Sequence, residues 1–186
     1  MADLDALVAL LRELSVRTGS FTLASGATSD FYVDARQTTL HGRGCKLVAD
    51  AVLERLQPEV VAVGGMTLGA DPIACSVAAR SPADRPIHAF LIRKQAKGHG
   101  TGRQVEGLAS VPAGSPVCIV EDTTTTGGSL LRAVAAAEAA GLRVVQCITV
   151  VDRQEGAAAA VAAEGYSLEA LTTRARLLDE PDTASS

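Results

Sequence analysis

The sequence predicts an α/β protein in which a central, mostly parallel sheet is flanked by helices. Two patterns lead to this prediction. Short apolar runs that can form buried strands alternate with segments of helical character, and polar or glycine pairs follow four of those runs. The composition, 47% hydrophobic and 20% charged, is that of a chain that folds around one core. We therefore expect a single domain over residues 1–178 and a frayed polar tail over 179–186.

The first half of the chain begins with helix signals. The leucines of residues 3–17 recur every three or four positions, which predicts an amphipathic helix. Residues 43–57 form the next helical segment, and Pro58 ends it. The apolar run at 60–63 has the length of a short buried strand, and Gly64-Gly65 predicts a turn directly after it.

The alternation of helix and strand continues to the end of the chain. Proline is tolerated in a first helical turn, and Gly141 can stop a helix, so both residue types mark boundaries here. The remaining expected elements, in order, are a helix over 68–80, a strand over 87–92, a strand over 117–120, an alanine-rich helix over 128–140, a strand over 144–151, a helix over 155–163 and a short strand over 168–171.

Polar and glycine pairs follow four of the expected strands. They are Gly64-Gly65, Arg93-Lys94, Glu121-Asp122 and Asp152-Arg153. The carboxyl ends of parallel strands meet at one edge of a sheet, where ligands of such sheets bind. We therefore expect one ligand site at this edge.

The connection over 95–116 is unusually long for a compact domain. It spans about 20 residues, and loops beyond about 12 to 15 residues are usually lids or disordered segments. It carries Lys97, His99 and Arg103 among glycines. This composition predicts a mobile lid over an anion.

The segment from Val117 to Leu130 carries the strongest chemical signal. An apolar strand leads into Glu121-Asp122, then into a hydroxyl- and glycine-rich loop and a helix. Backbone N–H groups at a helix start bind anions, and glycine lets the main chain approach a phosphate. The acids can accept hydrogen bonds from sugar hydroxyls while Mg²⁺ offsets ligand charge. The loop suits a phosphorylated sugar, although a capped strand-to-helix turn is the structural alternative. Its residues are Thr123, Thr124, Thr125, Thr126, Gly127, Gly128 and Ser129.

The bulk properties exclude several classes of protein. A net charge of −4 and a pI near 5.4 argue against binding to nucleic acid or to an anionic membrane. The four cysteines show no C-x-x-C spacing, and Cys118 and Cys147 stand in apolar runs, which favours reduced core thiols. The first 18 residues carry acids unlike a signal peptide, and no apolar run reaches 18 residues. We expect a soluble cytoplasmic protein.

The loop after 117–120 resembles the phosphoribosyl pyrophosphate motif of the type I phosphoribosyltransferases. Three further segments resemble the orotate branch of that family, and the alanine content is reminiscent of its actinobacterial members. The resemblance implies the type I fold, with a small hood built from about residues 1–40. It also implies an Mg²⁺-dependent homodimer with shared active sites that makes orotidine 5′-phosphate and pyrophosphate from orotate and phosphoribosyl pyrophosphate in UMP biosynthesis. The three segments are Phe21-Thr22-Leu23-Ala24-Ser25-Gly26 with Ser29-Asp30-Phe31-Tyr32, Arg93-Lys94-Gln95-Ala96-Lys97-Gly98-His99-Gly100, and Asp152-Arg153-Gln154-Glu155-Gly156.

The resemblance also implies roles for single residues. Glu121 and Asp122 correspond to acids that bind the ribose, and residues 123–129 to the cradle of the 5′-phosphate. Orotate would be held by Thr125 and Arg153. The expected pyrophosphate ligands are Arg93, Lys94, Lys97 and His99, and the expected catalytic residues are Lys97, His99, Arg93 and Asp122.

The base side leaves some interpretations open. Arg153 suits the carboxylate of orotate because a guanidinium pairs with it through two hydrogen bonds, and a surface ion pair of Arg153 with Asp152 or Glu155 is the structural alternative. Phe31 and Tyr32 resemble the aromatic pair beside orotate, with a core anchor as the alternative. His99 could act by charge or as a general acid.

Two departures and two alternatives remain. Ala24 replaces a frequent basic residue, and the stretch 64–72 lacks a frequent lysine, so two auxiliary phosphate contacts are in doubt. No protein metal site is expected, because Mg²⁺ would sit on the pyrophosphate and ribose of the substrate. The alternative functions are a phosphoribosyltransferase for another base and a non-catalytic sensor of phosphoribosyl pyrophosphate.

Overall fold

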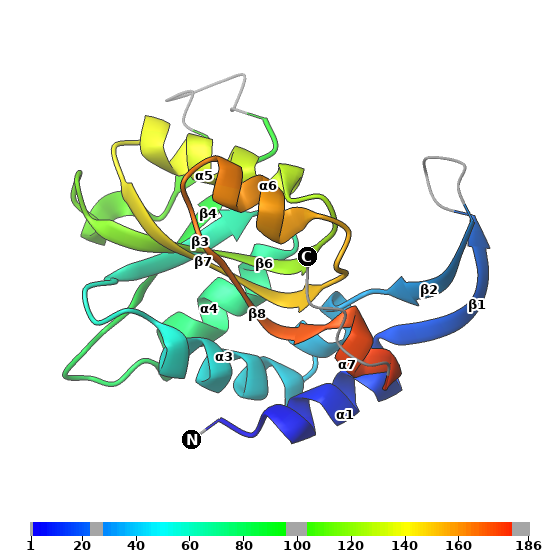
Figure 1. The fold of residues 1–186 in the computed structure, drawn as a ribbon. Helices are drawn as coiled ribbons and strands as arrows, with labels where there is room; N and C mark the ends of the chain where they lie inside the picture. Colours follow the sequence, from blue (N-terminus) through cyan, green and yellow to red (C-terminus); the bar gives the residue numbers. More distant parts are fainter. Residues whose placement is uncertain (1, 23–27, 96–103, 180–186) are drawn as a thin grey trace.

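The structure, a computed structural model, describes residues 2–22, 28–95 and 104–179 and is built on a six-stranded sheet (Figure 1). The strand order is β5-β4-β3-β6-β7-β8, and every neighbouring pair is parallel except β4 with β5. This confirms the predicted α/β class with a mostly parallel sheet. The strands are β3 (Ala62–Met66), β4 (His88–Ile92), β5 (Val105–Glu106), β6 (Pro116–Thr124), β7 (Arg143–Asp152) and β8 (Leu168–Thr173).

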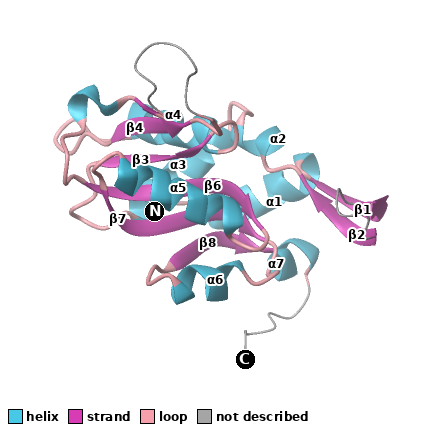
Figure 2. Cartoon of the chain, turned by 90° about the horizontal axis from the view of Figure 1, so that it is seen from above, coloured by secondary structure: helices cyan, strands magenta, loops and turns pink. Residues whose placement is uncertain are grey.

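Helices cover both faces of this sheet (Figure 2). Buried residues of α1, α3 and α4 share one hydrophobic cluster with the sheet, and those of α5 and α6 share another. No helix in the described part of the chain is long and apolar enough to cross a bilayer. The helices are α1 (Leu4–Leu14), α2 (Arg36–Thr39), α3 (Gly44–Arg55), α4 (Ala70–Arg80), α5 (Gly128–Ala139), α6 (Ala157–Ala163) and α7 (Arg174–Leu178).

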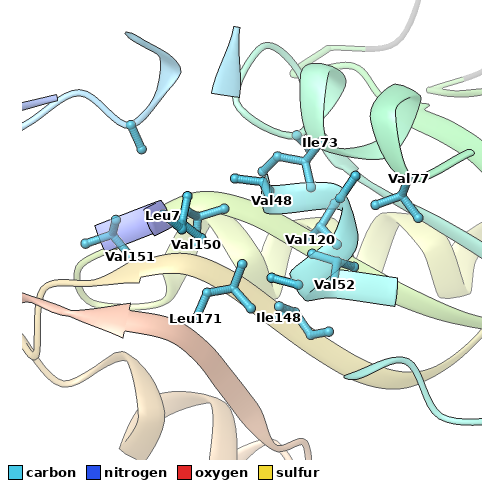
Figure 3. Close-up of a cluster of buried hydrophobic side chains, with 14 of the residues drawn as sticks. Leu7, Val48, Val52, Ile73, Val77, Val120, Ile148, Val150, Val151 and Leu171 are labelled. Atoms are coloured by element: carbon cyan, nitrogen blue, oxygen red, sulfur yellow. The ribbon is translucent and has the colours of Figure 1, made fainter. Parts of the chain in front are cut away.

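Strand β6 shows how the sheet feeds two cores. Val117 and Ile119 pack in the cluster with α5, whereas Cys118 and Val120 pack in the cluster with α3 and α4. Side chains alternate between the faces of a strand, so a continuously apolar strand must be buried on both. Figure 3 shows Val120 among the side chains of the cluster that includes α3 and α4. Cys118 and Cys147 are buried, which confirms that these two thiols belong to the core, whereas Cys45 is half-buried and Cys75 is exposed.

The amino-terminal region forms a hairpin that projects from the body (Figure 1). Strands β1 (Val16–Thr22) and β2 (Thr28–Val33) pair antiparallel. The predicted helix over 3–17 was too long, because Ser15 caps α1 and the β-branched Val16 already belongs to β1. This hairpin corresponds to the small hood that the sequence predicts.

Three further predictions of local structure need correction. Gly64-Gly65 lies inside β3 and forms no turn. Glycine is needed at these two positions because the neighbouring strands and helix leave no room for a side chain. A Cβ on Gly64 would lie 2.2 Å from the Phe90 carbonyl oxygen, and one on Gly65 would lie 2.2 Å from that of Val120. The segment 95–116 holds β5 and a 3₁₀ turn at Leu108–Ser110 in its described part. Finally, α7 follows β8, where no helix was expected.

Candidate active site

A polar cavity of about 220 Å³ lies between the carboxyl end of β6 and the start of α5, elements that adjoin in Figure 1. Because β6 is a central strand, this cavity stands at the edge of the sheet that the sequence predicts to bind a ligand. The hydroxyl- and glycine-rich loop supplies most of its wall. The lining residues are Glu121, Thr123, Thr124, Thr125, Thr126, Gly127, Gly128, Ser129 and Arg132.

Gly127 sets the direction of the loop at the cavity. It is the N-cap of α5 and has φ of 83°, a left-handed conformation that favours glycine. The turn delivers the chain into α5 with the first backbone N–H groups of the helix at the cavity wall, where they have no acceptor within the helix. These N–H groups and the helix dipole favour a bound anion.

Several polar atoms beside the cavity lack a partner in the protein. Among the described residues, Glu121 Oε2, Thr123 Oγ1 and Thr124 Oγ1 are buried without a hydrogen bond. Leaving a buried polar group unpaired costs about 1–3 kcal/mol. All three belong to the last residues of β6, which indicates a site that is completed by a polar ligand and which a simple capped turn does not explain.

The two neighbouring acids point in different directions because β6 continues through both. Glu121 lines the cavity on the α5 side. Asp122 lies instead against Gly69, at the start of α4, where a Cβ would stand 2.3 Å from Asp122 Oδ1. Arg36 is close enough to Asp122 to lower the pKa of that carboxyl. The sequence predicted the acids after the strand, whereas the strand reaches Thr124 and separates their side chains.

Burial raises the pKa of both acids. The pKa of Glu121 rises from 4.5 to about 7, mainly because the carboxylate loses hydration. A hydrogen bond from Ser129 and the charge of Arg132 oppose that shift, while Asp122 adds to it. The pKa of Asp122 is also raised by burial, against the backbone N–H of Thr123 and the charge of Arg36. Burial therefore makes the charged form of both carboxyls less favourable than in free side chains.

A second group of side chains meets around Phe31, which is only 1% exposed. The Arg153 guanidinium lies 5.9 Å from the centroid of the Phe31 ring, and that of Arg174 lies 5.7 Å from it. Arg153 follows β7 and also pairs with Glu155 at 2.7 Å. Its backbone N–H donates to the Thr124 carbonyl at 2.9 Å, which ties this group to the cavity loop.

The other expected site residues are less connected. Arg93 and Lys94 follow β4 and are exposed, and Arg93 pairs with Glu106 at 3.1 Å. Tyr32 is 41% exposed, and it acts electrostatically on Arg36. Lys97 and His99 lie outside the described residues, as does Ala24.

Four residues near the site were missed by the sequence predictions: Gly69, Arg36, Arg132 and Arg174. Arg174 follows β8 as Arg153 follows β7, so a longer predicted last strand would have pointed to it. Arg132 stands four residues after Gly128, which places it over the first helical turn. Arg36 had no comparable signal. Within the described ranges, no group of three or more His, Cys, Asp or Glu residues could hold a metal ion.

The sequence matches the model of the phosphoribosyl transferase domain over residues 41–164. It is 46% identical over 173 residues to orotate phosphoribosyltransferase of Thermosynechococcus vestitus, covering 92% of this chain and 91% of that protein. It is 49% identical over 168 residues to the enzyme of the same name from Mycobacterium leprae, covering 89% and 92%. The actinobacterial resemblance is therefore real.

Solved structures agree with this match. Mycobacterium tuberculosis H37Rv orotate phosphoribosyltransferase in complex with 5-phospho-alpha-D-ribosyl 1-diphosphate has a TM-score of 0.78 and 40% identity, covering 94% of this chain and 98% of that one. A Leishmania donovani adenine phosphoribosyltransferase shares the fold at a TM-score of 0.64 and 18% identity. The two relatives and the Mycobacterium tuberculosis structure are all named orotate phosphoribosyltransferase, and the chain belongs to the orotate phosphoribosyltransferases of the phosphoribosyltransferase family.

Proposed function

We propose that this chain transfers the 5-phosphoribosyl group of phosphoribosyl pyrophosphate to orotate, with the sugar phosphate and the base bound by separate groups of residues. The observation that supports this proposal most is the hydrogen bond from the Arg153 backbone N–H to the Thr124 carbonyl. It places the group of side chains around Phe31 directly beside the phosphate cavity. A phosphoribosyl unit held in the cavity would present its anomeric carbon toward a base held at Arg153.

The 5′-phosphate is assigned to the cavity around residues 123–129. Backbone N–H groups at the start of α5 and the threonine hydroxyls would donate to its oxygens. The unpaired Glu121 Oε2 can accept a hydrogen bond from a ribose hydroxyl, and Asp122 would do so from the other face of the strand. The complex of a close relative with phosphoribosyl pyrophosphate supports this assignment of the ligand.

The leaving pyrophosphate is assigned to Arg93 and Lys94, together with Lys97 and His99. Negative charge develops on pyrophosphate as its bond to the anomeric carbon breaks, so cations placed there lower the barrier. The Arg93–Glu106 pair is half-exposed on both sides and therefore weak, so Arg93 can exchange Glu106 for an oxyanion at little cost. Lys97 and His99 enter this assignment through the family resemblance alone.

A magnesium ion fits these residues as a companion of the substrate. Mg²⁺ is usually held by one or two carboxylates, water and substrate phosphates, and Glu121 offers a carboxylate at the wall of the cavity, while Asp122 offers one on the other side of β6, beside Gly69. When bound, the ion would offset negative charge on the pyrophosphate and ribose oxygens.

Orotate is assigned to Arg153 and Thr125, beside Phe31. A carboxylate distinguishes orotate from uracil, and an arginine can bind it through two hydrogen bonds. The Nε of Arg153 is buried without a partner in the described structure, although Glu155 already holds one end of the guanidinium.

The family resemblance further supports a homodimer with shared sites, and four free thiols suit a reducing cytoplasm.

Replacing Arg153 by Met tests the division between base and phosphate. The Michaelis constant for orotate should rise about 10- to 100-fold, because a charge-assisted pair is lost, while the affinity for ribose 5-phosphate stays the same. Arg143→Met is the matched control, because Arg143 begins the same strand and pairs with Glu59 at the opposite end. An equal loss of orotate and ribose 5-phosphate binding would contradict the proposed division.

A further inference from the structure

Arg132 is a cationic residue of the cavity to which neither the sequence motif nor the family resemblance gave a role. It lies in the second turn of α5 and lines the same cavity as the loop 123–129. Its Nη1 stands 3.7 Å from the position that a Cβ on Gly128 would take, so the guanidinium turns back toward the start of the helix. At this end of α5 the first backbone N–H groups have no acceptor within the helix and can bind an anion.

The cavity needs positive charge that the loop itself does not supply. Threonine hydroxyls and backbone N–H groups are neutral donors, and Glu121 adds negative charge. Arg132 is the one cation among the nine lining residues in the described structure. A sugar phosphate carries close to two negative charges at neutral pH, as phosphorylated side chains do, so a single guanidinium at the rim would change its binding strongly.

The surroundings of Arg132 leave its guanidinium available to a ligand. The side chain is exposed, and no carboxylate among residues 2–22, 28–95 and 104–179 forms a salt bridge with it. Its charge reaches Glu121, where it lowers the pKa of the carboxyl against the effect of burial. Side chains of an α-helix lean toward its N-terminus, so a residue one turn into α5 is well placed to reach the loop.

Building on the proposed function, we propose that Arg132 is a further phosphate-binding residue, which contacts the outer oxygens of the 5′-phosphate from the rim of the cavity. Gly128 at position i and Arg132 at i+4 lie on one side of the helix, so the missing side chain at Gly128 gives the guanidinium room to reach inward. The cradle then combines neutral donors below the phosphate with one charged donor above it.

Calorimetric titration of ribose 5-phosphate into the intact protein tests this inference without orotate. Arg132→Gln should weaken ribose 5-phosphate binding about tenfold, whereas Arg132→Lys should retain most of the affinity. The loss should shrink at high ionic strength, because charge at an exposed site is screened by salt. In turnover assays, Arg132→Gln should raise the Michaelis constant for phosphoribosyl pyrophosphate and leave that for orotate unchanged.

Two outcomes would overturn the inference. Equal affinity of wild type and Arg132→Gln for ribose 5-phosphate would show that the guanidinium does not contact the phosphate. Equal loss in Arg132→Gln and Arg132→Lys, together with a lowered unfolding temperature, would show a structural role. Failure of the proposed function is recognised separately, because the protein would then bind ribose 5-phosphate in an Arg132-dependent manner and still not consume orotate.

Discussion

Replacing Glu121 by Gln should change how the stability of the protein depends on pH. Glu121 sits at the wall of the cavity, and burial raises its pKa from 4.5 to about 7. Each pKa unit corresponds to 1.36 kcal/mol, so the difference between these two values amounts to about 3 kcal/mol of unfolding free energy. Glutamine keeps the size of the side chain and removes its titration.

The direction in which the unfolding free energy changes with pH depends on whether the folded or the unfolded state binds the proton of Glu121 more tightly. Between about pH 4.5 and 7 the folded protein keeps Glu121 protonated while the unfolded chain has released the proton. The folded state binds more protons there, so the unfolding free energy falls as pH rises through this window. Above about pH 7 the full destabilisation is present, and below about pH 4.5 it is absent.

Urea unfolding at pH 5 and pH 8 in a buffer free of phosphate measures the effect. Glu121→Gln should gain stability over wild type between the two pH values, by up to about 3 kcal/mol and by less where Asp122 titrates with it. Glu13→Gln, an exposed change on α1, is the matched control and should follow wild type. A Glu121→Gln profile parallel to that of wild type would refute the reasoning.

Three further changes test other parts of the site. Gly69→Ala should lower kcat/KM about 100-fold, because its Cβ would displace the Asp122 carboxylate, whereas Gly42→Ala has open space and should have no effect in the same steady-state assay. Arg174→Met should raise the Michaelis constant for orotate about threefold with that for phosphoribosyl pyrophosphate unchanged, because it removes positive charge beside Phe31, and rescue by Lys would separate charge from packing. Lys97→Ala should lower turnover far more than orotate binding, and equal losses in single-turnover and binding measurements would contradict its role at the pyrophosphate.

The main architecture could be predicted from the sequence because hydrophobic burial dominates it. The run from Val117 to Val120 is apolar throughout, and the structure buries both of its faces. The strand was nevertheless predicted to stop at the acids, since buried carboxylates are unfavourable. It continues to Thr124 because β7 pairs with it along that length, from the pair Pro116 and Arg143 to the pair Thr124 and Asp152. Such pairing is a tertiary contact that local sequence does not carry.

The amino-terminal hairpin and Gly64-Gly65 are two further places where local sequence does not reveal the tertiary contacts that decide the structure. Leucine spacing predicted α1 but not its end, because one β-branched residue is a weak local signal and Val33, the strand partner of Val16, lies more than ten residues ahead. Gly64-Gly65 has the composition of a turn, yet close approach of Phe90 and Val120 requires glycine inside a strand. A glycine needed for space and one needed for a turn look alike in sequence.

The cavity loop was predicted better than its surroundings. Hydroxyls, glycines and acids in one segment identify their chemistry locally, and residues 121 and 123–129 do line one cavity. Arg36, Arg132 and Arg174 come from three different helices, and their charges reach the site only through the fold. The opposite directions of Glu121 and Asp122 likewise depend on where β6 ends.

The most direct test of the account is the base that the purified protein consumes with phosphoribosyl pyrophosphate and Mg²⁺. Ultraviolet absorbance would follow orotate in one reaction, with uracil, hypoxanthine and adenine in parallel reactions. We expect turnover of orotate alone, because Arg153 is assigned to bind its carboxylate. Turnover of another base would contradict the assignment of the base site while leaving the phosphate cavity intact, and binding of phosphoribosyl pyrophosphate without any turnover would contradict the proposed enzyme.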